Sequence, residues 1–314
     1  MILRSILKYA TFPLALSISL ASVWISISWG SPEWVAATIG TVVGLFMIAA
    51  AERLNPYRED WLRSHGDLPT DLLHALVNAI VPESTRLFGH AIFIGLGATL
   101  IGTLGFSLWP DTLHPVLQLA LALVVAEFFA YWIHRATHEI AFFWPWHATH
   151  HSPPRLYCLN AARFHPVDLM ATHLAHTGTL LVLGCPAEVL ALHASFTAVH
   201  GFLQHANVDL RLGPLNWVFS MAELHRWHHS LVIEEANNNF GANLILWDIV
   251  FGTRFLPDGN EGPTAIGISE LPNYPESYLE HLRAPFDWER LQSIAGPEEH
   301  EPLPLDTPTS KIHP

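Results

Sequence analysis

The stretch WVAATIGTVVGLFMIAAA, residues 34–51, decides the fold class because it holds no charged side chain. Further uncharged stretches occupy residues 11–32, 87–110 and 112–126. Each is close to the roughly 20 apolar residues that cross the hydrocarbon core of a bilayer. A helix of this length in a soluble protein usually keeps a polar face. The four blocks therefore predict four membrane-spanning helices.

The positive charges predict one orientation for these helices. All 15 lysine and arginine residues fall on one side of the four-helix arrangement, and none lies in the two short loops on the other side, near 31–33 and 110–115. Loops rich in Lys and Arg stay on the cytoplasmic side of a membrane. We therefore expect a multi-pass integral membrane protein whose N-terminus, and the segment that follows residue 126, face the cytoplasm.

Composition divides the chain into three parts. We expect an N-terminal transmembrane region at 1–115, a histidine-rich catalytic domain at 116–257 and an acidic cytoplasmic tail at 258–314. The tail holds 11 acidic residues against three basic ones, and its end, 296–314, is expected to be disordered. The chain has only two cysteines and no CxxC motif, which argues against a thiolate metal site or a disulfide framework.

Three histidine clusters stand out in a chain of which only 14% is charged. They are HRATH at 134–138, HATHH at 147–151 and HRWHH at 225–229. Helix positions i, i+3 and i+4 share one face, so each cluster directs two or three imidazoles the same way. Neutral imidazole binds iron, zinc, copper or nickel. Eight such groups exceed the needs of one tetrahedral zinc and would suit two metal ions.

Other interpretations of these histidines are weaker. A single HxxHH could arise by chance or act as a pH switch, but two copies together with HxxxH favour metal binding. A metallopeptidase would need H-E-x-x-H, and His138-Glu139 is followed by Ile-Ala-Phe. The sequence also lacks a G-x-S-x-G elbow, a glycine-rich phosphate loop and a basic, aromatic surface for nucleic acid. Four solitary histidines are interpreted as hydrogen-bonded core residues: His74, His90, His114 and His193.

The histidine clusters resemble those of the fatty acid hydroxylase/sterol desaturase superfamily. Four flanking stretches carry the similarity further: AEFFAYWIHRATH at 126–138, Phe164-His165-Pro166, FLQHANVDL at 202–210 and NNFGANLILWDIVFGTRF at 238–255. The resemblance covers roughly residues 120–257, whereas the first 110 residues match only in hydropathy. In one departure from the family pattern, Glu127 stands where the family usually has Asp.

The resemblance implies a non-haem centre of two iron ions, which activates O2 and removes hydrogen from an unactivated C–H bond of a lipid. The implied metal ligands are nine histidines: His134, His138, His147, His150, His151, His205, His225, His228 and His229. His165 could be a further ligand or a hydrogen-bond partner of one, and we favour the partner role. His200 is left out, because it lies five residues from His205 and the paired histidines of some hydroxylases lie four apart.

Glu127 is the candidate for tuning this centre. It lies two helical turns before His134 on the same face, inside an apolar segment, where an ionisable group is expensive and usually functional. Carboxylates near a metal orient its histidine ligands and offset its charge. An interhelical hydrogen bond is the alternative role. Asp168, Glu223 and Asp248 are weaker candidates for the same task.

Two apolar segments keep alternative interpretations. Residues 169–204 form either a short transmembrane hairpin or a re-entrant pair, and the chain must return to the side it left for the histidine clusters to share one site. The aromatic run at 142–146 either walls the site against water or lies at the membrane interface.

The sequence thus predicts an all-α membrane helix bundle with a cytoplasmic, histidine-rich di-metal cap. We expect an O2-dependent hydroxylase of a lipid, acting on an acyl chain or a head group, with desaturation less favoured. A sterol or carotenoid substrate is the alternative within the class, and a membrane metal-binding or transport protein the alternative outside it. No haem-attachment motif, iron–sulfur cysteine set or G-x-G-x-x-G is present, so a separate electron donor, ferredoxin-like or cytochrome b5-like, is expected. No nucleic-acid partner is expected.

Overall fold

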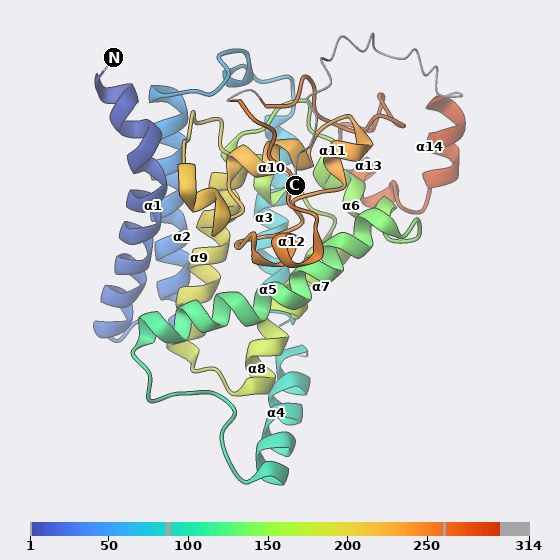
Figure 1. Ribbon diagram of the computed structural model, residues 1–314. Helices are drawn as coiled ribbons and strands as arrows, with labels where there is room; N and C mark the ends of the chain where they lie inside the picture. Colours follow the sequence, from blue (N-terminus) through green and yellow to red (C-terminus); the bar gives the residue numbers. More distant parts are fainter. Residues whose placement is uncertain (1, 86–88, 260–261, 296–314) are drawn as a thin grey trace, which may run out of the picture.

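The computed structural model describes residues 2–85, 89–259 and 262–295, and its regular secondary structure is helical (Figure 1). Within these ranges β-pairing is limited to isolated bridges. The predicted all-α fold class is therefore confirmed. The sequence-based expectation of disorder at 296–314 concerns residues outside the described ranges.

Three helices are long and apolar enough to cross a membrane: α1 (Ile2–Ser28), α2 (Glu33–Leu54) and α5 (Pro115–Glu139). The shorter described helices are η1 (Asp60–Leu62), α3 (Leu68–Thr85), α4 (Ala91–Leu104), α6 (Trp144–His151), η3 (Cys158–Ala162), α7 (Pro166–His173), η4 (Leu174–Gly178), α8 (Thr179–Leu183), α9 (Ala187–His205), η5 (Gly213–Trp217), α10 (Ala222–His228), α11 (Ile233–Ala236), α12 (Leu246–Phe251), α13 (Tyr278–Arg283) and α14 (Trp288–Ala295). In Figure 1, α10, α11 and α13 lie towards the upper end of the bundle and α4 and α8 towards the lower end.

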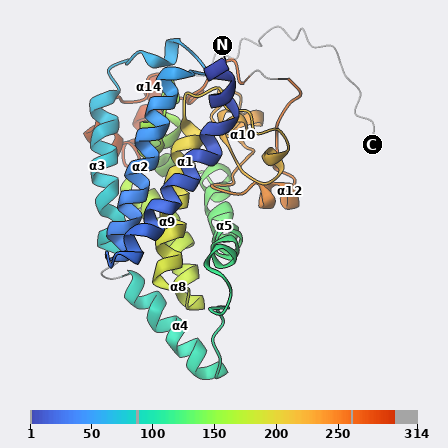
Figure 2. The same cartoon turned by 90° about the vertical axis from the view of Figure 1, so that its left-hand side faces the viewer.

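Helices α1, α2 and α9 pack side by side through small residues (Figures 1 and 2). A Cβ atom added at Gly40 would lie 2.5 Å from Val23 and 2.7 Å from Ser195, and one added at Gly44 would lie 2.5 Å from Val199. Small residues four apart let helices approach closely where lipid offers no hydrophobic driving force. The uncharged stretch around Gly40 and Gly44 is thus a helix-packing surface as well as a span.

Three of the four predicted spans coincide with helices that are long and apolar enough to cross a membrane. The stretches 11–32 and 34–51 lie in α1 and α2, and 112–126 lies in α5, which continues to the first histidine cluster. Of the stretch 87–110, the described residues from 89 onward include the 14-residue apolar helix α4, whereas residues 87 and 88 lie outside the described ranges. Gly105 ends α4 in the left-handed conformation, with φ 77°, a conformation that glycine adopts readily.

The predicted hairpin at 169–204 is helical in both arms. Its first arm is α7, the π-helical turn η4 and α8, and its second arm is α9. Gly184, with φ 82°, ends α8, and Pro186 precedes α9. The chain returns, because the last residue of α9, His205, lies against His225 of α10. The histidines of α9 and α10 can therefore share one site without another membrane-crossing segment between them.

Polar contacts tie the ends of the long helices to the histidine side of the bundle. Lys8 near the start of α1 pairs with Asp209 at 2.9 Å. At the end of α2, Oε1 of Glu52 accepts hydrogen bonds from the backbone N–H groups of Cys158 and Asn207. The start of α1 and the end of α2 therefore lie on the same side as His205, as the charge pattern predicted; Arg86 of that pattern lies outside the described residues.

Helix α3 was not singled out from the sequence, and it is held by buried charges rather than by apolar contacts. Asp71 pairs with Arg163 at 2.6 Å and Asp67 pairs with Arg155 at 2.7 Å, with all four side chains almost fully buried. Breaking one partner out of such a pair destabilises a protein by about 3–5 kcal/mol. These pairs fix α3 against the segment that follows the second histidine cluster.

Of the four solitary histidines, three are buried or half-buried and one is exposed. His74 is buried and hydrogen-bonded, as predicted. His193 is buried, but its Nε2 makes no hydrogen bond. His90 is half-buried against His173, with 3.2 Å between their Nε2 atoms. The interpretation of His114 as a core residue was wrong. It is exposed and caps the start of α5, where its Nδ1 accepts from the backbone N–H of Val116, because Pro115 begins the helix and leaves the preceding side chain outside it.

Candidate metal centre

The structure brings all nine predicted histidines together in two neighbouring groups. The five-histidine group holds His134, His138, His147, His151 and His228. The four-histidine group holds His150, His205, His225 and His229. Within each group one nitrogen from every ring lies within 4.8 Å of all the others. The rings come from the end of α5, from α6, from the end of α9, and from α10 with the residue after it.

Each HxxHH cluster is shared between the two groups. In the second cluster the i, i+4 pair His147 and His151 joins the five-histidine group, whereas His150 joins the four-histidine group. The third cluster does the reverse, because its i, i+4 pair joins the four-histidine group and His228 joins the other. Residues i+3 and i+4 diverge by about 100° around a helix with 3.6 residues per turn. One helical turn therefore serves two adjacent sites.

The separations between ring nitrogens fit metal coordination. Nε2 of His134 lies 3.1 Å from Nε2 of His147 and 3.0 Å from Nε2 of His228. In the other group, Nε2 of His225 lies 3.0 Å from that of His205 and 3.1 Å from that of His229. For metal–nitrogen bonds of about 2.1 Å, adjacent ligands lie about 3.0 Å apart in octahedral geometry and about 3.4 Å apart in tetrahedral geometry.

Several of these buried nitrogens have no partner within the protein. Nε2 of His138 and of His151, and Nδ1 of His225 and of His229, are buried without a hydrogen bond. An unsatisfied buried polar atom costs about 1–3 kcal/mol. A bound metal ion would satisfy Nε2 of His138 and of His151, whereas His225 and His229 present Nε2 to their group, so a metal there leaves their Nδ1 atoms unpartnered. The donor set therefore fits two metal ions, although the assignment of each ligand stays a prediction.

Hydrogen bonds fix which nitrogen most rings present to the centre. Nδ1–H donates to a protein acceptor in six of the nine histidines, which leaves Nε2 free to ligate. The six donor–acceptor pairs are His134 with the Phe240 carbonyl, His138 with Asn237 Oδ1, His147 with Asp168 Oδ2, His150 with the Arg163 carbonyl, His205 with Asn160 Oδ1 and His228 with the Asn238 carbonyl.

Asp168 makes the one carboxylate contact to a grouped histidine among the described residues. Its Oδ2 lies 2.8 Å from Nδ1 of His147, and both side chains are buried, at 2% and 3% exposed. A carboxylate in this position orients the ring and raises its basicity towards a metal. Asp168 follows the start of α7, which His165 caps by accepting from the backbone N–H of Val167.

Glu127 and Asp248 act on the loop that carries three of the acceptors, those of Asn237, Asn238 and Phe240. Glu127 is fully buried and accepts from the backbone N–H and the side-chain amide of Asn243, at 2.8 and 3.0 Å. Asp248 accepts from the backbone N–H groups of Phe240 and Gly241. The Phe240 carbonyl in turn accepts from His134 at 2.7 Å. Glu127 therefore holds the loop beside the histidines rather than a histidine itself.

Burial keeps the imidazoles neutral. Desolvation, together with neighbouring imidazoles, lowers the pKa of five grouped histidines outside the long helices well below their usual value of 6.5: His150, His151, His225, His228 and His229. Neutral imidazole is the form that binds a metal ion. The site is therefore prepared for a cation without having to release protons first.

Two other candidates, His165 and Glu223, lie outside both histidine groups, and so does His200, which the sequence analysis left out. His165 caps α7 and packs against Trp146, with 4.9 Å between ring centroids. Glu223 accepts from the backbone N–H of Leu212 and the amide of Asn216. His200 is buried between aromatic rings and contacts Phe12 and Phe196.

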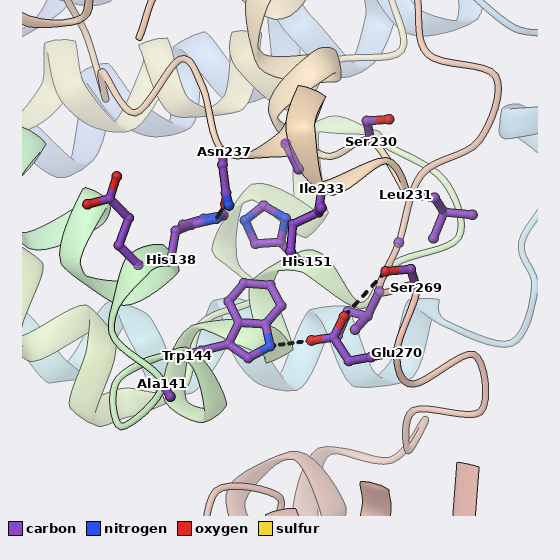
Figure 3. Close-up of a pocket in the computed structure, with 14 residues that line it drawn as sticks. His138, Ala141, Trp144, His151, Ser230, Leu231, Ile233, Asn237, Ser269 and Glu270 are labelled. Atoms are coloured by element: carbon purple, nitrogen blue, oxygen red, sulfur yellow. Dashed lines mark hydrogen bonds between the residues drawn. The ribbon is translucent and has the colours of Figure 1, made fainter. Parts of the chain in front are cut away.

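A surface pocket of about 260 Å³ reaches the five-histidine group from one side (Figure 3). His138, His151, Trp144 and Asn237 line it, and the indole N–H of Trp144 donates to Glu270 at 2.6 Å. The aromatic run at 142–146 is thus divided in function. Trp144 walls the site, whereas Phe142 is 72% exposed.

A second cavity, of about 360 Å³ and mostly apolar lining, reaches both groups from another side. Its histidine end includes His134, His147, His150, His205 and His225. Ligand sites are typically apolar cavities of this size with a few convergent polar groups. The two histidine groups therefore face a mostly apolar space suited to a hydrocarbon.

Sequence patterns did not reveal most of the acceptors that orient the rings. Asn160 lies in the short 3-10 helix η3. The carbonyls of Arg163 and Phe240 belong to irregular segments, and a carbonyl gives no side-chain signal. The run Asn237–Asn239 in front of Phe240 was the one available sign, since Asn favours such loop contacts. Asn239 has a positive φ of 56°, which asparagine tolerates better than most residues.

The all-helical fold and the paired histidine groups define a membrane histidine-box metalloprotein. A family model for fatty acid hydroxylases matches residues 119–253. Ornithine lipid hydroxylase OlsE of Rhizobium tropici is 35% identical over 257 residues, which are 81% of this chain and 77% of that protein. The chain belongs to the fatty acid hydroxylase family, as the sequence resemblance predicted.

Other relatives match a smaller share of the chain. Alkylglycerol monooxygenase of Homo sapiens is 32% identical over 132 residues, 42% of this chain and 29% of that protein. A putative Delta(7)-sterol-C5(6)-desaturase of Arabidopsis thaliana is 30% identical over 45% of this chain and 49% of that protein. No solved structure matches the chain. Because these relatives are a hydroxylase, a monooxygenase and a desaturase, the alternative of a membrane metal-binding or transport protein is not supported.

Proposed function

We propose that this protein is a membrane-bound di-iron hydroxylase that inserts one oxygen atom of O2 into a C–H bond of a lipid. One observation carries the proposal: two adjacent groups hold nine histidine rings in all, and five of these rings, drawn from both groups, line the end of a mostly apolar cavity. The similarity to an ornithine lipid hydroxylase over most of both chains supports a lipid substrate.

The chain's own residues hold and orient the reacting parts. The five- and four-histidine groups would each hold one iron ion, and the iron pair would supply the activation of O2. Asp168 and the carbonyl of Phe240 fix the rings of His147 and His134 through Nδ1. The apolar cavity walls keep water from the reacting carbon, which protects an oxidising site from side reactions.

The overall reaction consumes O2, two electrons, two protons and the lipid C–H, and yields the alcohol and one water. A separate electron donor, ferredoxin-like or cytochrome b5-like, would supply the electrons. We propose that the protein is multi-pass and that the histidine side faces the cytoplasm, which agrees with the basic residues at that side. The proposed three-part division at 1–115, 116–257 and 258–314 places the catalytic region in the middle part.

Lipid masses from a host that expresses the protein test the proposal. Wild-type protein and the His147→Ala variant are expressed together with an electron donor, and His65→Ala serves as a control at an exposed histidine. We expect a lipid that gains one oxygen with wild type and His65→Ala and not with His147→Ala. A loss of two hydrogens would indicate desaturation instead. No change in any lipid mass would contradict the enzyme proposal.

A further inference from the structure

The apolar cavity extends well beyond the histidine groups. Helix α9 lines it with a face that repeats every four residues: His193, Thr197, Gly201 and His205. Residues four apart share one face of a helix. His205 belongs to the four-histidine group, and His193 lies twelve residues earlier, which is about 18 Å along a helix axis. One helix face thus connects the candidate metal centre to a second polar region.

This second region contains polar atoms without a partner. Nε2 of His176, Nε2 of His193 and Oγ1 of Thr197 are buried and make no hydrogen bond. Such atoms are rare in native proteins, and each calls for an explanation such as an absent ligand. His176 lies in the π-helical turn η4, and π turns occur frequently at functional sites.

The partnered histidine beside them shows that the unpaired atoms are not a general property of the region. His173 also lines the cavity, but its Nε2 lies 3.2 Å from Nε2 of His90, so these two rings satisfy each other. An imidazole ring turns about a soft χ2 torsion. His176 and His193 can therefore turn a nitrogen towards a group in the cavity.

The cavity lining selects the chemical class of that group. Among the described lining residues there is no lysine or arginine, and the carboxylate Asp168 is already paired with His147. A carboxylate, phosphate or ammonium at this end would be buried without a counter-charge, which is strongly unfavourable. Imidazole and hydroxyl groups both donate and accept hydrogen bonds, so they match an uncharged hydroxyl or carbonyl.

We propose that His176, His193 and Thr197 form a subsite for an uncharged hydrogen-bonding group of the substrate, a hydroxyl or an ester or amide carbonyl. This inference rests on the proposed function, because it takes the cavity to be the place where the lipid binds. With its polar group held there, the carbon segment passes Gly201 towards the histidine groups. The subsite therefore selects the reacting carbon by its distance from the polar group, and a charged head group stays outside the cavity.

Ligand-dependent thermal unfolding of the purified, metal-loaded protein in detergent micelles tests the subsite without turnover. The probes are dodecan-1-ol, dodecane and dodecanoate, and a ligand that binds the native state raises the unfolding temperature with concentration. We expect dodecan-1-ol to bind about tenfold more tightly than dodecane, as one satisfied hydrogen-bonding group allows. We expect dodecanoate to bind no better than dodecane.

Variants of Thr197 and His193 localise the effect. Thr197→Val removes the hydroxyl at nearly constant shape, Thr197→Ser keeps it, and His193→Phe removes the ring nitrogens. The preference for the alcohol should fall in Thr197→Val and in His193→Phe and persist in Thr197→Ser. Unfolding without probe shows whether each variant is folded. Equal binding of alcohol and alkane by wild type, or an unchanged preference in both variants, would overturn the subsite.

The subsite and the proposed function can be contradicted independently of each other. Wild-type protein that prefers dodecan-1-ol but produces no modified lipid would contradict the proposed function and leave the subsite intact. Wild-type protein that hydroxylates a lipid but binds alcohol and alkane equally would contradict the subsite alone.

Discussion

Replacing Asp168 by alanine should weaken metal binding at the five-histidine group. The Asp168 carboxylate lies 2.8 Å from Nδ1 of His147, and both side chains are at most 3% exposed. Without it the buried N–H of His147 loses its acceptor, which costs about 1–3 kcal/mol. Outer partners of this kind change metal affinity by about 10–100-fold. Asp168→Asn can keep an acceptor oxygen but loses the charge, so its loss should be smaller.

Anaerobic titration of the purified apoprotein with Fe(II), followed by desalting and metal analysis, measures this affinity. Glu223→Gln is the matched control, because that carboxylate contacts Leu212 and Asn216 instead of an imidazole. We expect the control to bind iron as wild type does. An Asp168→Ala variant whose two sites both keep the wild-type affinity would refute the role assigned to this carboxylate.

Three further outcomes follow from the packing around the centre. Gly201→Leu should lower the amount of lipid product about 100-fold, because the new side chain displaces the substrate. The free energy of unfolding should stay unchanged, because a Cβ at Gly201 meets no atom within 4 Å. An amount of product equal to that of wild type would show that the cavity is not the substrate site. Asp71→Ala leaves Arg163 buried and unpaired and should destabilise the protein by about 3–5 kcal/mol, measured by denaturant unfolding; an unchanged midpoint would contradict this. Glu127→Gln should turn one of the two acceptor oxygens into a donor facing Asn243 and lower the amount of lipid product about tenfold. Glu127→Asp, which carries the residue usual in the family, should retain more of the activity. Equal losses of activity in both variants would argue against a charge-dependent role.

The sequence predicted that the histidines share one site, but it did not predict which of them belong to each of the two groups. Cluster spacing indicated shared helix faces, and the structure gathers those same nine rings. His150 and its neighbour His151 belong to different groups. This division depends on how α6 lies relative to α9 and α10. Spacing within one helix carries no information about which neighbouring helix completes each group.

Hydropathy likewise identified the apolar blocks but did not predict the lengths of their helices. The block at 87–110 is uncharged throughout, but Gly105 ends α4 at Leu104, before the block itself ends. Helix α3 was overlooked for the opposite reason. Its buried face carries Asp71, His74 and Asn78, whose partners are Arg163, His281 and backbone carbonyls, so its burial leaves no apolar stripe in the sequence.

The metal content of the purified protein tests the central claim most directly. After anaerobic loading with Fe(II), wild-type protein should hold about two iron ions per chain, as two-metal sites do. The double variant His134→Ala/His138→Ala should lose one of them, and His225→Ala/His229→Ala should lose the other, so each should retain about one ion per chain. A wild-type content of one ion or fewer, or the loss of all iron in either double variant, would contradict two histidine groups that each hold their own metal.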